Sequence, residues 1–266
     1  MSARFTAGQA AWAAGAQLLS GAPDQMFEGA FTDSRTPVPG ALFVALVGER
    51  HDGSLFAAAA AQAGAGGVLV PSSAAARVRD ELAAQGLRPA LLAAQDTGRA
   101  LGRIAHAWRE SLPGIRVVCV TGSTGKTSTK ELVASVLETA GPTLKTEGNL
   151  NNEVGVPLTL LRLSPAHRNA VIEAGMNHLG EIARLAAWAD PDVGLVTNAG
   201  PVHLEGVGSM DGVAHAKGEL FHALRESATA VANADDPRVL QQARLSRRRL
   251  ITFGASTAAD VRLISA

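Results

Sequence analysis

An apolar run leads directly into a glycine-containing loop at residues 115–131, IRVVCVTGSTGKTSTKE. The run 115–121 predicts a buried strand, and the residues after the loop predict a helix over 126–140. In parallel α/β sheets, loops of this kind lie beyond the carboxyl end of a strand, where ligands gather. The segment therefore predicts an α/β fold with a parallel sheet.

The rest of the sequence extends this pattern on both sides. Further strand-then-loop units follow at 169–175, 193–200 and 228–236, and two short strands are predicted at 249–254 and 261–266. Before the loop, strands are predicted at 40–46 and 66–70, with helices at 54–64 and 97–111. LPG at 112–114 marks a domain boundary. We therefore expect a small N-terminal α/β domain at 1–112, followed at 113–266 by a P-loop-type, mostly parallel sheet flanked by helices.

The glycine loop has the residues of a phosphate-binding loop. The usual pattern is G-x-x-x-x-G-K-[ST]; here Val120 replaces the first Gly, leaving Gly122-x-x-Gly125-Lys126-Thr127. Backbone N–H groups at the helix start would face the phosphates, Lys126 would bridge them, and the Thr127 hydroxyl would ligate Mg²⁺. An ordinary turn capping a helix is the alternative. The residues expected to bind nucleotide are Gly122, Ser123, Thr124, Gly125, Lys126, Thr127 and Ser128.

Charge and composition exclude several classes of protein. Lys plus Arg equals Asp plus Glu at 24 each, so bulk charge favours neither a nucleic-acid nor a membrane partner. One cysteine, Cys119, rules out an internal disulfide framework. The sequence has no leader pattern and no 18-residue apolar run, so we expect a soluble, cytoplasmic protein. Only four of the 24 basic residues are Lys, which directs attention to Lys126 and Lys217 as places where an amine is required.

Polar side chains follow the later strands of the predicted sheet. Glu173 is suited to a hard cation, and His203 and Lys217 would add an imidazole and an amine on successive loops. Each has a plainer alternative as a surface, structural or solvated residue. Asn233, in NADDP, would contact an adenine edge or belong to a simple turn. In the first domain, TDSR at 32–35 would hold a ribose or diphosphate, or form a polar turn.

Taken together, these segments resemble the Mur ligase family, which builds the peptide of bacterial cell-wall precursors. The resemblance runs from TDSR to NADDP. KTEGNLNNEVGVPLTLL (145–161) and EAGMNHLGEIARLA (173–186) are most similar to the MurF type. That type implies an ATP-dependent amide ligase that adds D-alanyl-D-alanine to UDP-N-acetylmuramoyl-tripeptide. The γ-phosphoryl group would pass to the terminal carboxylate, and the amine would attack the resulting acyl phosphate. Because this chemistry crowds anions together, cations are needed around them.

The resemblance also implies roles for individual residues. Lys126, Lys217 and His203 would be catalytic, and two Mg²⁺ ions would be held by Thr127, Glu173, His203 and a Lys217 carbamylated by CO₂. Asn233 would contact the adenine of ATP. The substrate-binding residues would be Ser34, Arg35, His51, Asp52 and Gly53 at the uridine diphosphate end, and Asn149, Asn151 and Asn152 near the muramoyl-peptide or the metals.

The sequence leaves other functions open. Family members carry a third, C-terminal domain that has no counterpart in these 266 residues. We therefore expect the chain to lack it, to keep its substrate-binding residues and to depend on that domain for turnover. A non-catalytic nucleotide- or UDP-sugar-binding module is one alternative, and the sibling ligase that adds the third peptide residue is another, although EGNLNNEVG disfavours the sibling. Other P-loop NTPases usually place Asp, not Glu, after the strand, and folate polyglutamate ligases lack the UDP-end motif. We expect a monomer that binds no nucleic acid and does not insert into membranes.

Overall fold

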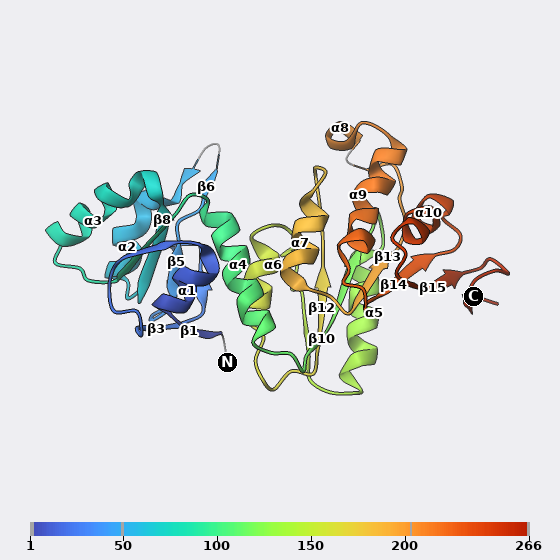
Figure 1. Ribbon diagram of the computed structural model, residues 1–266, viewed down its shortest axis with the longest axis horizontal. Coiled ribbons are helices and arrows are strands. Elements are labelled where there is room, and N and C mark those ends of the chain that lie inside the picture. Colours follow the sequence, from blue (N-terminus) through green and yellow to red (C-terminus); the bar gives the residue numbers. More distant parts are fainter. Residues whose placement is uncertain (1–2, 49–50, 203, 265–266) are drawn as a thin grey trace. The chain divides into compact units, whose positions relative to one another are not determined.

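The computed structural model describes residues 3–48, 51–202 and 204–264 (Figure 1). Contacts divide the chain into two units, each with its own sheet. The first unit comprises Met1–Ser111 with Leu160–Ser164, and the second comprises Leu112–Thr159 with Pro165–Ala266. Leu160–Ser164 packs with the first unit although it lies within the expected range 113–266. The leucines of this segment are buried, and its Leu161 and Leu163 carbonyls accept hydrogen bonds from the Ala3 N–H and from Trp108 Nε1 of the first unit.

The first unit is built on a five-stranded sheet in the order β2-β9-β8-β5-β4. Its strands are parallel except β2, which runs antiparallel to β9. Two antiparallel pairs, β1 with β3 and β6 with β7, stand outside this sheet. The elements are β1 (Arg4–Thr6), α1 (Ala7–Ala14), β2 (Gln17–Ser20), β3 (Met26–Glu28), β4 (Ala30–Phe31), β5 (Leu42–Val44), β6 (Val47–Gly48), β7 (His51–Asp52), η1 (Gly53–Phe56), α2 (Ala57–Gln62), β8 (Gly67–Pro71), η2 (Ser72–Ala74), α3 (Ala75–Ala84), β9 (Ala90–Ala94) and α4 (Thr97–Glu110).

Local sequence explains where the helices of this unit begin and what they cover. α1 starts at a capping box, in which Thr6 and Gln9 each accept the other's backbone N–H. α4 starts at Asp96, whose carboxylate accepts the Arg99 N–H. The core shared with α2 and α3 includes Phe31, Phe43, Val68 and Val70 of β8, and Leu91 and Ala93 of β9.

The second unit is built on a seven-stranded sheet in the order β11-β12-β10-β13-β14-β15-β16, and every neighbouring pair is parallel. Helix α5 packs on β10, β11 and β12, while α7 and α9 pack on β10 and α10 on β14. The elements are β10 (Arg116–Thr121), α5 (Lys126–Glu138), β11 (Thr143–Lys145), α6 (Gly155–Leu160), β12 (Asn169–Glu173), α7 (Glu181–Ala189), β13 (Val193–Val196), α8 (Leu204–Val207), α9 (Met210–Ala223), β14 (Thr229–Asn233), α10 (Pro237–Leu245), β15 (Arg249–Gly254) and β16 (Val261–Arg262).

The topology of this sheet predicts where a ligand binds. β10 lies between β12 and β13, and the chain leaves β10 to build β11 and β12 on one side before crossing to β13 on the other. Ligands of such sheets bind beyond the carboxyl ends of the strands where the order changes direction. The loops that follow β10, β12 and β13 therefore share one edge.

The fold class expected from the sequence is confirmed: the protein is α/β, and its parallel sheet is flanked by helices. Differences lie at the ends and in short elements. The helix expected at 126–140 ends at Glu138. Of the strand expected at 261–266, Val261–Arg262 pair with β15, and residues 265–266 lie outside the described residues. β9, ALLAA, was not predicted as a strand, because a short Ala- and Leu-rich run fits a helix equally well.

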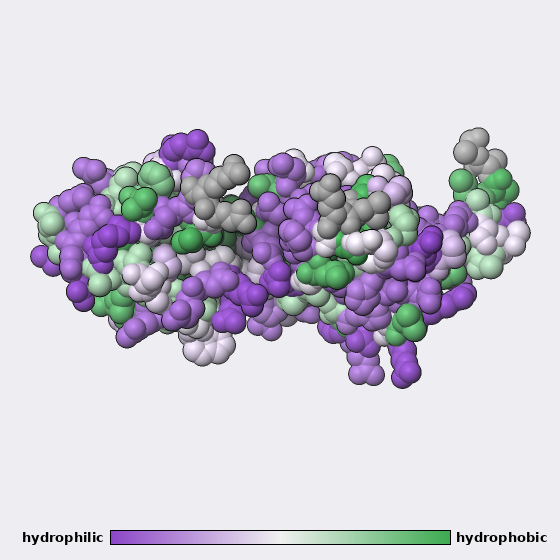
Figure 2. Space-filling model, turned by 90° about the horizontal axis from the view of Figure 1, so that it is seen from above, coloured by the Kyte–Doolittle hydropathy of each residue, from purple (hydrophilic) through white to green (hydrophobic). Residues whose placement is uncertain are grey.

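The surface seen in Figure 2 is mostly hydrophilic, with hydrophobic residues in small separate patches. Within the part of the chain that the structure describes, no helix combines the length and the apolar character needed to cross a membrane.

Candidate active site

The glycine loop between β10 and α5 depends on glycine at two positions. Gly125 precedes the first residue of α5 with φ +77°, in the left-handed region that favours glycine. Gly122 has φ +147°, and a Cβ there would lie 1.9 Å from Thr197 Oγ1. The loop therefore takes its shape only because both positions lack a side chain, and this leaves its backbone open to an approaching anion.

Residues beyond β13 hold this loop in place. The Thr124 N–H donates to Asn198 Oδ1 at 3.0 Å, and Thr197 Oγ1 donates to the Thr124 carbonyl at 2.7 Å. Ser123 Oγ accepts from the Gly200 N–H at 2.9 Å. Sequence reasoning assigned no role to Thr197 or Asn198. Their position directly after a predicted strand, next to the glycine loop in a parallel sheet, was the signal that could have found them.

Two lysines bring positive charge to this edge. Lys126 Nζ donates to the Gly122 carbonyl at 2.9 Å, so its ammonium lies against the loop. Lys217, on α9, has 1% of its surface exposed, and its Nζ has no hydrogen-bond partner among the described residues. Burial first, and then the nearby Lys126 charge, lower the pKa of Lys217 to about 8. Lys217 thus becomes a partly neutral amine near physiological pH.

Thr127 and Glu173, two of the metal ligands predicted from the sequence, lie in contact at the carboxyl edge of the sheet. Thr127 Oγ1 donates to Glu173 Oε2 at 3.0 Å, and Asn151 Nδ2 donates to Glu173 Oε1 at 2.8 Å. A hydroxyl and a carboxylate oxygen are ligands that Mg²⁺ prefers. His203 lies outside the described residues. Among those that are described, no group of three His, Cys, Asp or Glu side chains could hold a metal.

The other two asparagines of the 149–152 loop are placed differently. Asn152 Oδ1 accepts from the Val154 and Gly155 N–H groups at 3.1 and 2.8 Å, so its side chain caps α6. Asn149 is exposed at the surface. Among the residues that the structure describes, Asn151 is the one of the three that contacts a predicted metal ligand.

A hollow of about 520 Å³ opens beside the glycine loop over β13, β14 and β15. Asn233 lines it, but the Asn233 amide is engaged, donating to the Thr197 carbonyl at 2.9 Å and accepting from the Asp235 N–H. Sequence reasoning missed most of its walls, because half-buried residues on a strand face are indistinguishable from core in a sequence. The hollow is lined by Thr124, Gly125, Thr129, Leu195, Thr197, Asn198, Val231, Asn233, Ile251, Phe253 and Val261.

The first unit has a hollow of about 500 Å³ around the TDSR turn. Arg35 makes a two-point contact with Asp33, including Nη2 to Oδ2 at 2.7 Å, and this contact lowers the pKa of Asp33 to about 2. Asp52 does not line the hollow, because its carboxylate accepts from the Ser54 N–H and hydroxyl. The lining residues are Thr32, Asp33, Ser34, Arg35, Phe43, Leu46, His51, Gly53 and Phe56, of which the sequence did not single out Phe43, Leu46 or Phe56.

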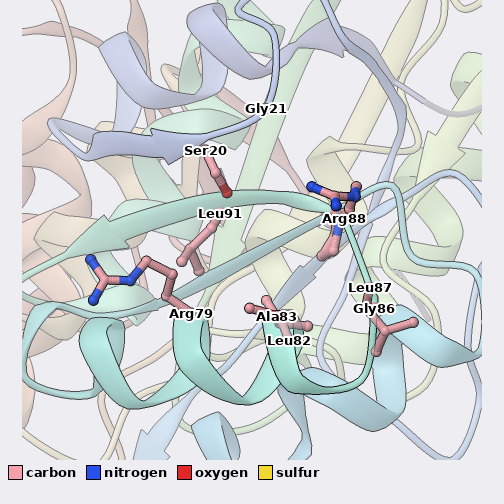
Figure 3. Close-up of a pocket in the computed structure, with 10 residues that line it drawn as sticks. Ser20, Gly21, Arg79, Leu82, Ala83, Gly86, Leu87, Arg88 and Leu91 are labelled. Carbon is pink, nitrogen blue, oxygen red and sulfur yellow. The ribbon is translucent and has the colours of Figure 1, made fainter.

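A further hollow of the first unit, about 400 Å³ in volume, takes none of the predicted residues. Figure 3 shows Arg79 and Arg88 on opposite sides of it, with Leu82 and Ala83 from α3 and Leu91 from β9. Both arginines are exposed to solvent, as most arginines in proteins are.

Both units match families of known proteins. The Mur ligase middle domain matches residues 120–265, and the Mur ligase family catalytic domain matches residues 27–109. The UDP-N-acetylmuramoyl-tripeptide–D-alanyl-D-alanine ligase of Escherichia coli (strain K12) is 48% identical over 218 residues, which cover 82% of this chain and 45% of that protein.

Solved structures of Mur ligases share the fold of this chain. A crystal structure of MurF from Acinetobacter baumannii superposes with a TM-score of 0.85 at 31% identity, covering 97% of this chain and 54% of the other. The MurF ligase of Thermotoga maritima in complex with ADP superposes with a TM-score of 0.72 at 30% identity, covering 86% and 50%. The chain spans about half the length of the relatives that it matches. With matches over both units and a shared fold, the chain belongs to the Mur ligase family.

Proposed function

We propose that this chain binds ATP and UDP-N-acetylmuramoyl-tripeptide for the ligation of D-alanyl-D-alanine to the tripeptide, in the synthesis of peptidoglycan precursors in the cytoplasm. The observation that carries the proposal is the contact of Thr127 with Glu173 beside the glycine loop, with the buried Lys217 amine near Lys126. The substrates follow from the name of the Escherichia coli relative, which is 48% identical.

The nucleotide would lie along the glycine loop. Backbone N–H groups at the start of α5 and the Lys126 ammonium would meet its phosphates, as in other phosphate-binding loops. The adjoining hollow has apolar walls at Ile251, Phe253 and Val261, which suit the faces of a purine base. ADP is bound in the MurF ligase of Thermotoga maritima, which has the same fold.

Thr127 and Glu173 would hold a Mg²⁺ ion, which supplies charge neutralisation for the crowded phosphate oxygens. Lys217 fits a second site only after modification. A buried amine without a hydrogen-bond partner and with a lowered pKa is available in its neutral form. That form can attack CO₂ and release one proton, and the carbamate produced would present two oxygens that share a negative charge in place of the amine. His203 would join this second site.

The residues of this chain would act mainly by positioning and charge. Lys126 would stabilise the phosphoryl group as it moves to the terminal carboxylate of the tripeptide, giving an acyl phosphate. The amine of D-alanyl-D-alanine would then attack the carbonyl carbon, and phosphate would leave. Asn151 would keep Glu173 in place through its amide contact.

The first unit would take the uridine diphosphate end of the substrate. Ser34, Arg35, His51 and Gly53 line one hollow, and Phe43 and Phe56 offer apolar surface for the uracil. Because Arg35 already contacts Asp33, its guanidinium would have to share or exchange that partner on binding diphosphate. In the second unit, Asn149, Asn151 and Asn152 would contact the muramoyl-peptide or the metals.

The test is release of ADP from ATP in the presence of Mg²⁺, UDP-N-acetylmuramoyl-tripeptide and D-alanyl-D-alanine, with each component withheld in turn. Release that requires both peptide substrates supports the ligase. Saturable binding of the tripeptide without release would favour a non-catalytic nucleotide- and UDP-sugar-binding module instead. A protein that neither releases ADP nor binds the tripeptide would overturn both functions.

A further inference from the structure

Lys130 is a buried lysine to which the proposed function gives no role. It lies on α5, four residues after Lys126, and 1% of its surface is exposed. Burial of an ammonium group is costly unless it is fully hydrogen-bonded, and this chain contains only four lysines. A buried lysine in such a chain therefore calls for a specific partner.

The partner of Lys130 is the backbone carbonyl of Thr146, the residue that follows β11. Lys130 Nζ donates to the Thr146 carbonyl at 2.8 Å and lies 2.9 Å from Glu131 Oε1. Thr146 is fully buried, and its Oγ1 accepts from the Glu173 N–H at 3.0 Å. One residue, Thr146, thus joins the Lys130 ammonium to the backbone of Glu173.

The loop that starts at Thr146 also reaches the Glu173 side chain. It carries Asn151, whose amide donates to Glu173 Oε1 at 2.8 Å and whose carbonyl accepts from the Gly175 N–H at 2.7 Å. The backbone and the carboxylate of Glu173 are therefore both held from one loop. Lys130 fastens the start of that loop to α5, the helix that carries Thr127.

We propose that Lys130 is a positioning residue that sets the Glu173 carboxylate against Thr127 and so tunes the affinity of this pair for the nucleotide-bound cation. The inference rests on the proposed function, in which Thr127 and Glu173 hold that cation. Lysine suits the place because a compact ammonium on a thin stem serves one carbonyl and one carboxylate, whereas a planar guanidinium presents five donors.

The experiment compares the affinity of the protein for ADP with Mg²⁺ and with EDTA, by calorimetric titration. Lys130→Met keeps an unbranched side chain, one atom shorter, and removes its hydrogen-bond donor. We expect the gain in ADP affinity due to Mg²⁺ to fall by about tenfold or more, as for other supporting partners of metal ligands, with ADP binding in EDTA unchanged. A purely structural role would weaken both.

Two further variants make the result decisive. Thr146→Val keeps the carbonyl that Lys130 contacts and removes only the hydroxyl that holds Glu173, so it should reproduce the selective loss even if Lys130→Met does not fold. Lys145→Met removes the other lysine that contacts Glu131. Its side chain is partly exposed and its ammonium donates to Glu131, so this variant should bind Mg²⁺ and ADP as the wild type does.

The outcomes separate this inference from the function on which it rests. If folded Lys130→Met and Thr146→Val retain the full effect of Mg²⁺, the positioning role is refuted while the cation site stands. If wild-type protein binds ADP equally well with Mg²⁺ and with EDTA, the cation site itself is refuted, and the role of Lys130 with it.

Discussion

Lys217 carries an energetic cost in the folded protein that its proposed modification would relieve. Its amine is buried without a hydrogen-bond partner in the described structure, and its pKa is lowered to about 8 from the ordinary 10.5. Between these two pH values the unfolded chain holds a proton at this site that the folded chain has released. Stability therefore rises with pH across that window, and below pH 8 the folded state bears the whole cost of the buried charge.

Lys217→Met should remove that cost. In CO₂-free buffer at pH 7 we expect its free energy of unfolding to exceed that of the wild type by about 3 kcal/mol, the value of the pKa difference. The gain should shrink above pH 8 and be lost near pH 10.5. Chemical denaturation over this pH range measures it.

A matched control is Lys145→Met, because the Lys145 ammonium is partly exposed and paired with Glu131. This variant should show no gain. A stability gain in Lys217→Met that stays constant to pH 10.5, or a loss at pH 7, would contradict the assignment of a costly buried ammonium.

At the scale of single residues, the sequence predicted the location of side chains that follow strands better than the location of side chains in turns. Thr127 and Glu173 meet because parallel strands end at one edge, which the sequence pattern already implied. Asp52 and Asn152 instead cap neighbouring backbone groups, a use that any Asp or Asn before a helix can adopt. The hydrogen bond between Lys130 and the Thr146 carbonyl could not be predicted from the sequence, because it depends on how α5 packs on β11.

At the scale of elements, the glycine loop is the most constrained turn of the site. Gly122→Ala would place a methyl group 1.9 Å from Thr197 Oγ1 in a backbone region unfavourable for alanine. We expect a loss of about 2 kcal/mol or more in the free energy of unfolding, together with loss of ADP binding. Denaturant titration and calorimetry measure the two effects.

Gly114→Ala is the control for this prediction, because nothing lies within 4 Å of its added Cβ and its φ is not in the left-handed region. It should change stability by less than about 0.5 kcal/mol. If Gly122→Ala were equally mild and still bound ADP, the close approach to Thr197 would not constrain the loop.

Most of the longer buried strands were predicted, with the Ala- and Leu-rich β9 as the exception, whereas most of the two- and three-residue strands were not. β12 and β10 were found because each is a continuous apolar run ending in polar residues. β1, β3, β6 and β7 are two- and three-residue strands, and each forms by antiparallel pairing with another strand as short as itself. Such pairing leaves almost no periodic signal in two or three residues, so sequence reasoning could not find it.

At the scale of the whole molecule, the two units are not two continuous stretches of sequence. Leu163 belongs to the first unit, where its side chain is fully buried and its carbonyl accepts from Trp108 Nε1 at 3.0 Å. Leu163→Ala should therefore destabilise the first unit by about 3 kcal/mol. Hydrogen exchange should show faster exchange in α4, β8 and β9, with β12, β13 and β14 unchanged.

The matched control is Leu185→Ala, a fully buried leucine of α7 in the second unit. It should give the reverse pattern, with faster exchange around β10 and β13. Equal effects of Leu163→Ala on both units would show that the segment Leu160–Ser164 is not part of the first unit alone.

Recognition of the tripeptide precursor is central to the proposed function. The most direct test is a calorimetric titration with UDP-N-acetylmuramoyl-tripeptide and, separately, with UDP-N-acetylmuramoyl-dipeptide, the substrate of the sibling ligase. We expect saturable binding of both through the uridine diphosphate end, with the tripeptide bound at least about tenfold more tightly, a difference of about 1.4 kcal/mol. Equal affinity for the two, tighter binding of the dipeptide, or no binding of either would contradict the claim.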